Sequence, residues 1–406
     1  MNILRVIASM DPATGGPCQG IRNLVPELKK IGLRNEVVCL DEEDSSFLED
    51  DGFKIHALGK GKGPWCYNGE LIPWLIKNLH RFDVVVIHGL WLYPSYAVTK
   101  AMKYLKNESK KNKQKVFQIP RVFVMPHGML DPYFQKDSGR KLKALRNVVY
   151  WKLIEKEVIK QADGILFTCQ EELELARQPF RPYNPKREIN IRYGIKIPPV
   201  FSIKMKPAFL KQCPGIGSDQ YFLFLSRIHD KKGVDLLIEA YSNQLMTEIK
   251  NGSQFPKLVI AGPGLETSYG SKIREQINSK PNLKNKIELP GLLLGDAKWG
   301  AYYGCEAFIL PSHQENFGIV VAEALACGKP VLISDKVNIW REIYDDGAGI
   351  VASDTLEGVK KLFTTWSMMP PEDKLSMTKK AMQSFKSNFT SQAAAIRFRE
   401  VVTMDK

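Results

Sequence analysis

The 406-residue sequence contains no Asp-x-Asp pair and no group of His, Cys, Asp or Glu at the spacing of metal ligands. We therefore expect chemistry without a divalent metal and without any other cofactor. A Gly-x-Gly-x-x-Gly dinucleotide pattern is also missing. Gly15-x-x-x-x-Gly20 imitates half of a P-loop, but Ile21-Arg22 follows where Lys and Ser or Thr belong. These absences argue against dehydrogenases and P-loop kinases.

Long apolar runs and paired cysteines are absent as well. No apolar stretch is long enough to span a membrane, and the start, Met1–Ala8, is too short and wrongly flanked for a signal peptide. We therefore expect a cytoplasmic protein. The seven cysteines are scattered without a Cys-x-x-Cys, which favours small buried hydrophobes over a zinc ribbon or disulfides.

Basic residues are in excess, and the formal net charge is +14. The excess concentrates in residues 100–115 and 136–160, where Lys and Arg alternate with Leu, Val, Tyr and Trp at helical spacing. Two interpretations are about equally supported: helices lying on the inner face of an anionic membrane, or ordinary amphipathic helices with a solvated basic face. A nucleic-acid partner is not expected, since the chain has no helix-turn-helix, RNA-binding or zinc-finger signature.

Short apolar runs alternate with helical stretches in two series, which predicts an α/β protein with parallel sheets. The predicted strands of the first series are Ile3–Ala8, Glu36–Leu40, Val84–His88, Arg121–Met125 and Gly164–Thr168. Those of the second are Tyr221–Ser226, Lys257–Ala261, Lys286–Leu289, Ala307–Leu310, Val331–Ser334 and Gly349–Val351.

The two series indicate two doubly wound domains, 1–200 and 201–384. The Pro-rich stretch from Ile191 to about Gln220 reads as the linker. A polar helical tail of about 385–406 is expected to pack back on the first domain. In such folds, ligands bind at the carboxyl ends of the strands, so we expect a cleft between the carboxyl ends of both sheets.

Glu315 and Glu323 are the most informative residues. Glu315 follows a predicted buried strand, and a short apolar helix is predicted from Asn316 to Gly328, with Glu323 about two turns inside it. A helix N-terminus presents unpaired N–H groups and partial positive charge. Two acids flanking an anion site suggest hydroxyl groups bound on either side of a phosphate, as in a sugar nucleotide.

Cations that would suit such a phosphate follow another predicted strand. Arg227 and Lys232 leave the end of Tyr221–Ser226 and its loop. A guanidinium grips two phosphate oxygens and an ammonium adds a point charge, so the pair would neutralise a diphosphate leaving group. Solvated charges on a loop are the alternative, and the presence of the Glu315–Glu323 segment decides against it.

Histidines and glycines supply weaker signals. His88 and His127 each stand at the end of a predicted strand with a glycine next to them, where they could contact sugar hydroxyls. Gly15 and Gly16 follow the first strand and allow close approach of a phosphate or sugar. Gly262 follows a strand of the second domain and could form the floor for a nucleotide base.

At these positions the chain resembles the family 4 retaining glycosyltransferases of the GT-B fold. The resemblance rests on Glu-x7-Glu (Glu315, Glu323), the Arg227/Lys232 pair, Gly15-Gly16 and Pro126-His127-Gly128, and it runs nearly end to end. One segment departs from it: many members carry a glycine pair after the strand matching Val331–Ser334, where this chain has residues 335–342.

The resemblance implies the following roles. Glu315 would contact hydroxyls of the donor sugar, Glu323 would hold the ribose, and His127 would hydrogen-bond the transferred sugar near its reacting face, so Glu315 and His127 are the catalytic candidates. The diphosphate would be bound by Arg227, Lys232, Gly16, Gly318, Ile319 and Val320. The donor sugar would also touch Asn316, Phe317 and Gly318. The base is expected near Gly262 and Leu292, and the acceptor near Gly15 and His88.

The implied activity is transfer of a hexose, with retention, from a UDP- or GDP-sugar to a saccharide or lipid-linked acceptor in exopolysaccharide or envelope polysaccharide synthesis. UDP-glucose is favoured only because such donors are common. Two alternatives stay open: a non-catalytic module that binds nucleotide sugars, and a sugar-nucleotide epimerase that would use His88 and His127.

Overall fold

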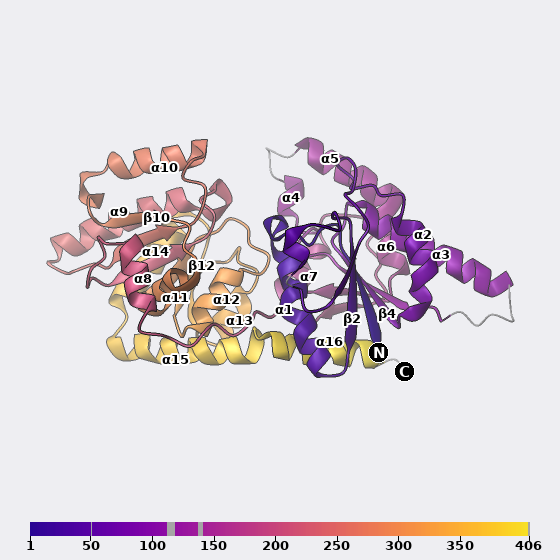
Figure 1. Ribbon diagram of the computed structural model, residues 1–406. Coiled ribbons are helices and arrows are strands. Elements are labelled where there is room, and N and C mark those ends of the chain that lie inside the picture. Colours follow the sequence, from indigo (N-terminus) through magenta and orange to yellow (C-terminus); the bar gives the residue numbers. More distant parts are fainter. Residues whose placement is uncertain (50, 112–117, 137–140, 405–406) are drawn as a thin grey trace. The chain divides into compact units, whose positions relative to one another are not determined.

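A computed structural model describes residues 1–49, 51–111, 118–136 and 141–404. The chain divides into two compact units, each drawn in Figure 1. Unit 1 comprises Met1–Ile195 and Ser391–Lys406, and unit 2 comprises Lys196–Thr390.

Unit 1 is built on a parallel sheet of seven strands in the order β3-β2-β1-β4-β5-β6-β7. Its strands are β1 (Asn2–Val6), β2 (Arg34–Cys39), β3 (Lys54–Ala57), β4 (Val84–His88), β5 (Arg121–Met125), β6 (Gly164–Phe167) and β7 (Glu188–Asn190). Its helices are α1 (Gly16–Lys30), α2 (Leu71–Asn78), α3 (Tyr93–Lys111), α4 (Tyr133–Lys136), α5 (Lys141–Tyr150), α6 (Lys156–Gln161), α7 (Gln170–Ala176) and α16 (Ser391–Thr403), with a π-helical turn η5 (Trp151–Glu155) between α5 and α6.

Unit 2 has a parallel sheet of six strands in the order β10-β9-β8-β11-β12-β13. Its strands are β8 (Tyr221–Leu225), β9 (Lys257–Ala261), β10 (Ile287–Gly291), β11 (Ala307–Leu310), β12 (Val331–Ser334) and β13 (Gly349–Ala352). Its helices are α8 (Met205–Gln212), α9 (Val234–Lys250), α10 (Ser268–Asn278), α11 (Gly295–Gly304), α12 (Ile319–Ala326), α13 (Trp340–Asp345), α14 (Leu356–Met368) and α15 (Pro371–Asn388).

Every predicted strand is present within a few residues of its expected bounds. The predictions missed β3 and β7. Both are short and only partly buried, so neither shows the continuous apolar run that marked the others.

The sheet of unit 1 has two different faces. Leu4 and Val6 of β1 belong to the large apolar cluster shared with α2 and α3, while Ile7 packs with residues of α1. Because strand side chains alternate, Arg5 lies on the face opposite to Leu4 and Val6, where its guanidinium meets Phe398 of α16. This face carries the histidine cluster described below.

The predicted linker is wrong in part, because it contains helix α8. Met205 and Phe209 of α8 are buried. They pack so closely on α11 that a Cβ at Gly300 would lie 2.1 Å from the Met205 carbonyl oxygen. The prolines masked a helix whose stability comes from this contact.

The segment after residue 385 is also not one helix. Ala381 and Phe385 of α15 are buried in unit 2, while α16 belongs to unit 1. Ser391 N donates to Ile195 O at 3.0 Å, and Arg397 Nε donates to Asn190 O at 2.8 Å, so α16 is tied to unit 1 by its own hydrogen bonds.

The predicted basic segments correspond to the end of α3 and to α5, η5 and α6, while Lys113, Lys115 and Arg140 lie outside the described residues. Within the described ranges, no helix combines the length and the apolar character needed to cross a bilayer. All seven cysteines are free thiols, and each is buried or partly buried, as predicted.

Candidate functional site

Lys232 and Glu315 form an ion pair in unit 2. Lys232 ends the 3-10 turn η6 (Asp230–Lys232), which follows β8, and its Nζ donates to Glu315 Oε2. The two side chains are 10% and 24% exposed. Gly233 lets the turn pack on the end of β11: its φ is +63°, and a Cβ there would lie 2.3 Å from the Pro311 carbonyl oxygen.

Glu315 is held by the segment in which the sequence departs from the family pattern. Glu315 N donates to Lys336 O at 2.9 Å, and Asn338 N donates to Glu315 O at 2.9 Å. Glu315 therefore forms a small parallel bridge with Val337. Sequence reasoning gave residues 335–342 no role, whereas the structure shows that their backbone fixes Glu315.

Helix α12 begins at Ile319, three residues later than predicted, because Gly318 adopts the left-handed conformation (φ +75°) and caps it. Val321 N and Ala322 N donate to Gly318 O, so the N–H groups of Ile319 and Val320 lie outside the helix's own hydrogen bonds. They mark the positive end of the helix.

Phe317, which precedes α12, has a buried side chain. The Phe317 side chain is 6% exposed and packs edge-on against Phe389, with ring centroids 5.9 Å apart. Any contact that Phe317 makes with a ligand would therefore come from its backbone.

Glu323 has two partners that sequence reasoning missed. Lys298 Nζ donates to Glu323 Oε1 at 2.7 Å, and Tyr302 OH donates to Glu323 Oε2 at 2.9 Å. Burial, followed by the charge of Glu323, holds the pKa of Tyr302 well above its ordinary value, so this phenol stays a donor. The only sequence signal was Lys298 and Tyr302 four residues apart on α11, on one helix face.

Arg227 and Gly262 lie where strands β8 and β9 end. The Arg227 side chain is exposed and makes no hydrogen bond or ion pair with another described residue, while its neighbours are fixed: Ser226 N donates to Ala261 O at 3.1 Å and Ile228 N to Pro263 O at 2.8 Å. A Cβ at Gly262 (φ +141°) would lie 1.8 Å from Ser226 O. Leu292, 54% exposed, follows Gly291, whose carbonyl accepts from Gly262 N.

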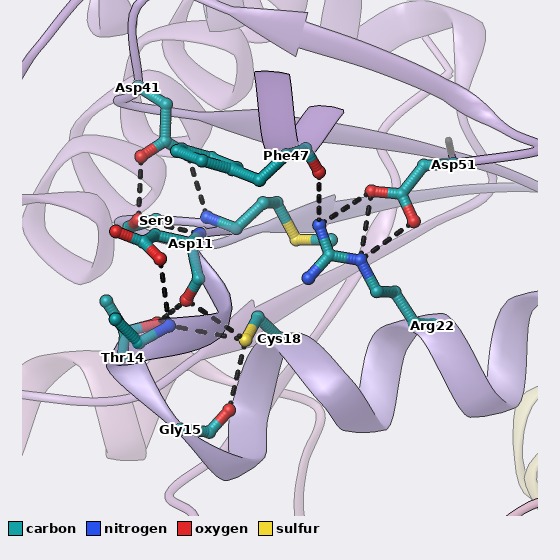
Figure 2. Close-up of polar contacts among 11 residues, drawn as sticks. Ser9, Asp11, Thr14, Gly15, Cys18, Arg22, Asp41, Phe47 and Asp51 are labelled. Atoms are coloured by element: carbon teal, nitrogen blue, oxygen red, sulfur yellow. Dashed lines mark hydrogen bonds and ion pairs between the residues drawn. The ribbon is translucent and has the colours of Figure 1, made fainter. Parts of the chain in front are cut away.

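Hydrogen bonds hold the glycine loop of unit 1 in place (Figure 2). Asp41, which follows β2, accepts from Ser9 Oγ at 2.6 Å and from Met10 N at 2.7 Å. Cys18 Sγ donates to Gly15 O at 3.0 Å. These contacts fix the strand-to-helix turn before α1. No motif in the sequence had marked Asp41.

Gly15 and Gly16 themselves face open space. Gly15 has φ +98°, and a Cβ at either glycine would meet no atom within 4 Å. Tyr193 OH donates to Gly16 O at 2.7 Å and so anchors the start of α1. The turn therefore combines a fixed backbone with an uncovered surface, as a ligand that approaches the main chain requires.

His88 and His127 are in direct contact in unit 1. His88 Nδ1 lies 2.9 Å from His127 Nε2, and the two ring planes are inclined by 22°. Burial lowers the pKa of His127 to about 3, with a further contribution from Arg5, and lowers the pKa of His88 well below its usual range. Both rings are therefore neutral at physiological pH.

Each unit thus gathers its own set of predicted residues. Unit 2 holds Arg227, Lys232 and Glu315 near the ends of β8 and β11, and Glu323 on α12. Unit 1 holds Gly15 and Gly16 after β1, His88 at the end of β4, and His127 after β5. Among the residues that the structure describes, no group of three or more His, Cys, Asp or Glu could hold a metal ion.

Family models match most of the chain. Residues 15–189 match a glycosyl transferase 4-like domain, and residues 209–382 match glycosyl transferases group 1. The first range lies in unit 1 and the second in unit 2.

Individual relatives are more distant. The chain is 28% identical over 137 residues to a D-inositol 3-phosphate glycosyltransferase of Kineococcus radiotolerans. The matched region covers 33% of this chain and 31% of the relative, so the chain spans about a third of that protein's length. Among solved structures, Anabaena HepE in complex with UDP and glucose is similar over 100% of both chains, with a TM-score of 0.70 at 17% identity.

WaaG, a glycosyltransferase involved in lipopolysaccharide biosynthesis, covers 99% of both chains with a TM-score of 0.65 at 13% identity. At these identities the solved structures establish the fold. Together with the two family models, they show that the chain belongs to the family 4-type glycosyltransferases of the GT-B fold.

Proposed function

We propose that this protein is a retaining hexosyltransferase. It takes a hexose from a nucleotide diphosphate sugar, with UDP-glucose favoured, and transfers it to a saccharide or lipid-linked acceptor in exopolysaccharide or envelope polysaccharide synthesis. One observation carries the proposal: Glu315, paired with Lys232, precedes the N-terminus of α12 in the chain, and Glu323, held by Lys298 and Tyr302, lies within the same helix.

The donor would be bound by unit 2. Arg227 and Lys232 would neutralise the diphosphate together with the N–H groups of Ile319 and Val320. Lys298 and Tyr302 hold Glu323 by both oxygens and so fix the orientation of the carboxylate. Its remaining lone pairs would accept from the ribose hydroxyls. The structural neighbour HepE forms a complex with UDP and glucose, which supports this ligand class.

The reaction would proceed on one face of the sugar. The acceptor hydroxyl oxygen bonds to the anomeric carbon as the bond from that carbon to the diphosphate breaks, and the leaving phosphate oxygen takes the acceptor's proton. The cations stabilise the charge that develops on the diphosphate, so no metal is required in this scheme. Glu315 and His127 would orient the sugar and form no covalent bond to it.

Product analysis with radiolabelled UDP-glucose and a panel of saccharide and lipid-linked acceptors tests the proposal. Transfer with retained anomeric configuration in the presence of a chelator is expected. Unchanged donor would favour the non-catalytic module, and isomerised donor would favour the epimerase. The epimerase has little structural support, because it requires acid and base groups on both faces of the sugar, whereas His88 is hydrogen-bonded to His127.

Matched substitutions test the phosphate assignment. Arg227→Ala and Lys232→Ala should abolish transfer and leave the fold intact. Arg274→Ala and Lys272→Ala are the controls, since both residues are exposed on α10. Near wild-type rates in either site variant would contradict the assignment.

The base and the sugar are tested by ligand stabilisation. Gly262 and Leu292 lie at the carboxyl ends of β9 and β10, where the base is proposed to rest. Thermal unfolding in a panel of nucleoside diphosphates should show the largest shift with UDP, because a ligand stabilises the state that binds it. A larger shift with GDP would replace UDP by GDP in the proposal.

We also propose that unit 1 contacts anionic membranes through α5 and η5. Leu142, Leu145 and Leu153 are 84%, 64% and 74% exposed, and Lys141, Lys143, Arg146 and Lys152 lie among them. Apolar side chains beside cations suit the headgroup region of an anionic bilayer. The protein should co-sediment with anionic vesicles but not with zwitterionic vesicles. The double variant Leu142→Ser/Leu145→Ser should no longer co-sediment, and equal sedimentation of this variant would refute the membrane contact.

A further inference from the structure

Arg5 is a buried cation in the middle of strand β1. Its side chain is 1% exposed, its Nε donates to Asn35 Oδ1 at 3.0 Å, and its guanidinium lies 5.1 Å from the Phe398 ring centroid. Among the described residues, no carboxylate forms an ion pair with it. Burying a charge without a counter-ion costs several kcal/mol, so an arginine at this position calls for a specific reason.

A chain of hydrogen bonds leads from Arg5 to His127. Arg5 Nη1 lies 3.2 Å from His88 Nε2, and His88 Nδ1 lies 2.9 Å from His127 Nε2. Sheet register explains the first contact: Val6 pairs with Ile87, and Arg5 and His88 lie on the same face of adjacent strands.

The donor in each bond follows from the chemistry of the groups. Arginine can only donate, so His88 Nε2 accepts. A neutral imidazole has one donor and one acceptor, so the proton of His88 is on Nδ1 and is donated to His127 Nε2. The proton of His127 must then be on its own Nδ1. Burial and the charge of Arg5 keep both rings neutral, since both lower the histidine pKa values.

We propose that Arg5 is a positioning residue that locks His88 and His127 in their Nδ1–H tautomers, so that His127 Nδ1–H is a fixed, neutral hydrogen-bond donor. The inference rests on the proposed function, in which His127 bonds the transferred sugar. His127 Nδ1 has no hydrogen bond to another described residue, so this end of the chain is available to a ligand.

The backbone around His127 supports the same assignment. His127 has φ +53° and Gly128 φ +77°, and Gly128 N donates to the buried Glu172 Oε1 at 2.5 Å. The main chain beside His127 is therefore held by Glu172, while the ring itself is held by His88. A neutral Nδ1–H donor binds a hydroxyl without giving up its proton, so His127 orients the sugar and does not act as the acid of the reaction.

Other titratable groups face the same cluster. Arg192 and Tyr193, in the segment after β7, line a small cavity together with Arg5, His88 and His127. Glu172 lies on α7, next to Gly128. Any pH dependence of the histidine pair therefore includes these groups as well as Arg5.

Nuclear magnetic resonance of protein labelled with ¹⁵N-histidine tests the inference without any substrate. The chain has six histidines, and His88→Gln and His127→Gln assign the two of interest. Long-range ¹H–¹⁵N spectra separate protonated from bare ring nitrogens. In the wild type, both rings should show a bare Nε2 and a protonated Nδ1, unchanged from about pH 8 to about pH 5, where a free histidine would titrate.

Substitutions at Arg5 supply the decisive comparison. Arg5→Met removes the donor to His88, so the tautomers of both rings should redistribute and the pKa of His127 should rise. Arg5→Lys keeps a charge and a donor and should restore the wild-type spectrum in part. The control is Arg34→Met, because Arg34 is exposed on the neighbouring strand β2 and should change neither ring. Transfer by Arg5→Met should fall about 10-fold, the worth of one hydrogen bond, with Arg5→Lys closer to the wild type.

Two results would overturn the inference: a protonated Nε2 on His127 in the wild type, or unchanged ring signals for both histidines in Arg5→Met. If Arg5→Met does not fold, the wild-type spectrum still shows which ring nitrogen of His127 carries the proton. Because the spectra need no substrate, a failure of glycosyl transfer would refute the proposed function and leave the tautomers as measured. Transfer by an enzyme with the wrong tautomer would refute only this inference.

Discussion

Replacing Glu315 by Gln is expected to strengthen UDP binding while it weakens glycosyl transfer. In the free protein, the Lys232 ammonium is occupied by Glu315. A diphosphate that recruits Lys232 must compete with this ion pair. The amide side chain in Glu315→Gln would carry no charge and would release Lys232, whereas contact of residue 315 with the donor sugar would be impaired.

The size of the effect follows from the exposure of the pair. The Lys232 and Glu315 side chains are 10% and 24% exposed. Their ion pair is therefore intermediate between a surface ion pair, worth about 0.2–1 kcal/mol, and a charged hydrogen bond, worth about 1.5–3 kcal/mol. We take about 1 kcal/mol, which corresponds to a UDP dissociation constant about 5-fold lower. Transfer should fall at least about 10-fold, because one charged hydrogen bond to the sugar is lost.

Isothermal titration calorimetry with UDP at fixed salt measures the first effect, and the labelled-donor assay measures the second. The control is Glu239→Gln, which breaks the ion pair of Glu239 with Lys280 (3.0 Å) elsewhere on unit 2. This variant should leave UDP affinity unchanged.

A double variant separates competition for Lys232 from the simple removal of a negative charge. In a Lys232→Met background, Glu315→Gln should no longer improve UDP binding through the ion pair. Competition between Glu315 and UDP for Lys232 is refuted if Glu315→Gln weakens UDP binding, or if the substitution improves binding equally with and without Lys232.

Three further outcomes are expected. Gly233→Ala should lower the stability of unit 2 by about 2–4 kcal/mol, because left-handed strain adds to the clash with Pro311. The control Gly252→Ala, at φ +72° with no atom within 4 Å, should cost only about 1 kcal/mol. Equal denaturation midpoints for the two variants would contradict the predicted clash. Lys298→Met should weaken UDP binding about 10-fold in calorimetry, since Glu323 loses a charged partner, and unaltered affinity would remove Glu323 from the ribose site. Burial raises the pKa of Glu155 from 4.5 to about 7, so the folded protein holds this proton more tightly than the unfolded chain. The stability of unit 1 should therefore fall as pH rises from about 4.5 to about 7. In Glu155→Gln this contribution is absent, and an equal slope of the urea midpoint against pH would disprove it.

The order of elements could be predicted from sequence because it rests on local patterns. Apolar runs such as Val84–His88 and Ala307–Leu310 are long enough to be read without knowledge of their neighbours. The failures have two causes. Strands β3 and β7 are only half-buried and lack an apolar run, and α8 contains Pro207, while its packing on α11 has no signature in its own residues.

The candidate site could be located from sequence but not assembled. Glu315, Glu323, Arg227 and Lys232 were recognised from their spacing and their places after predicted strands. Their partners were not: Lys298 lies 25 residues from Glu323, and Lys336 and Asn338 hold Glu315 through main-chain atoms that any residue provides. Such contacts depend on the register of β11 with β12 and on how α11 packs.

The sequence by itself determined the α/β class, the two series of strands and the residue types that a nucleotide sugar requires, because periodicity and charge are properties of neighbouring residues. Only the tertiary structure decided which acid pairs with which cation. It also placed Arg5, a charged residue in an apolar strand, at the start of the series of hydrogen bonds that runs through His88 to His127. Hydrogen-bond direction and tautomer depend on atoms that are distant in sequence and adjacent only in the folded sheet.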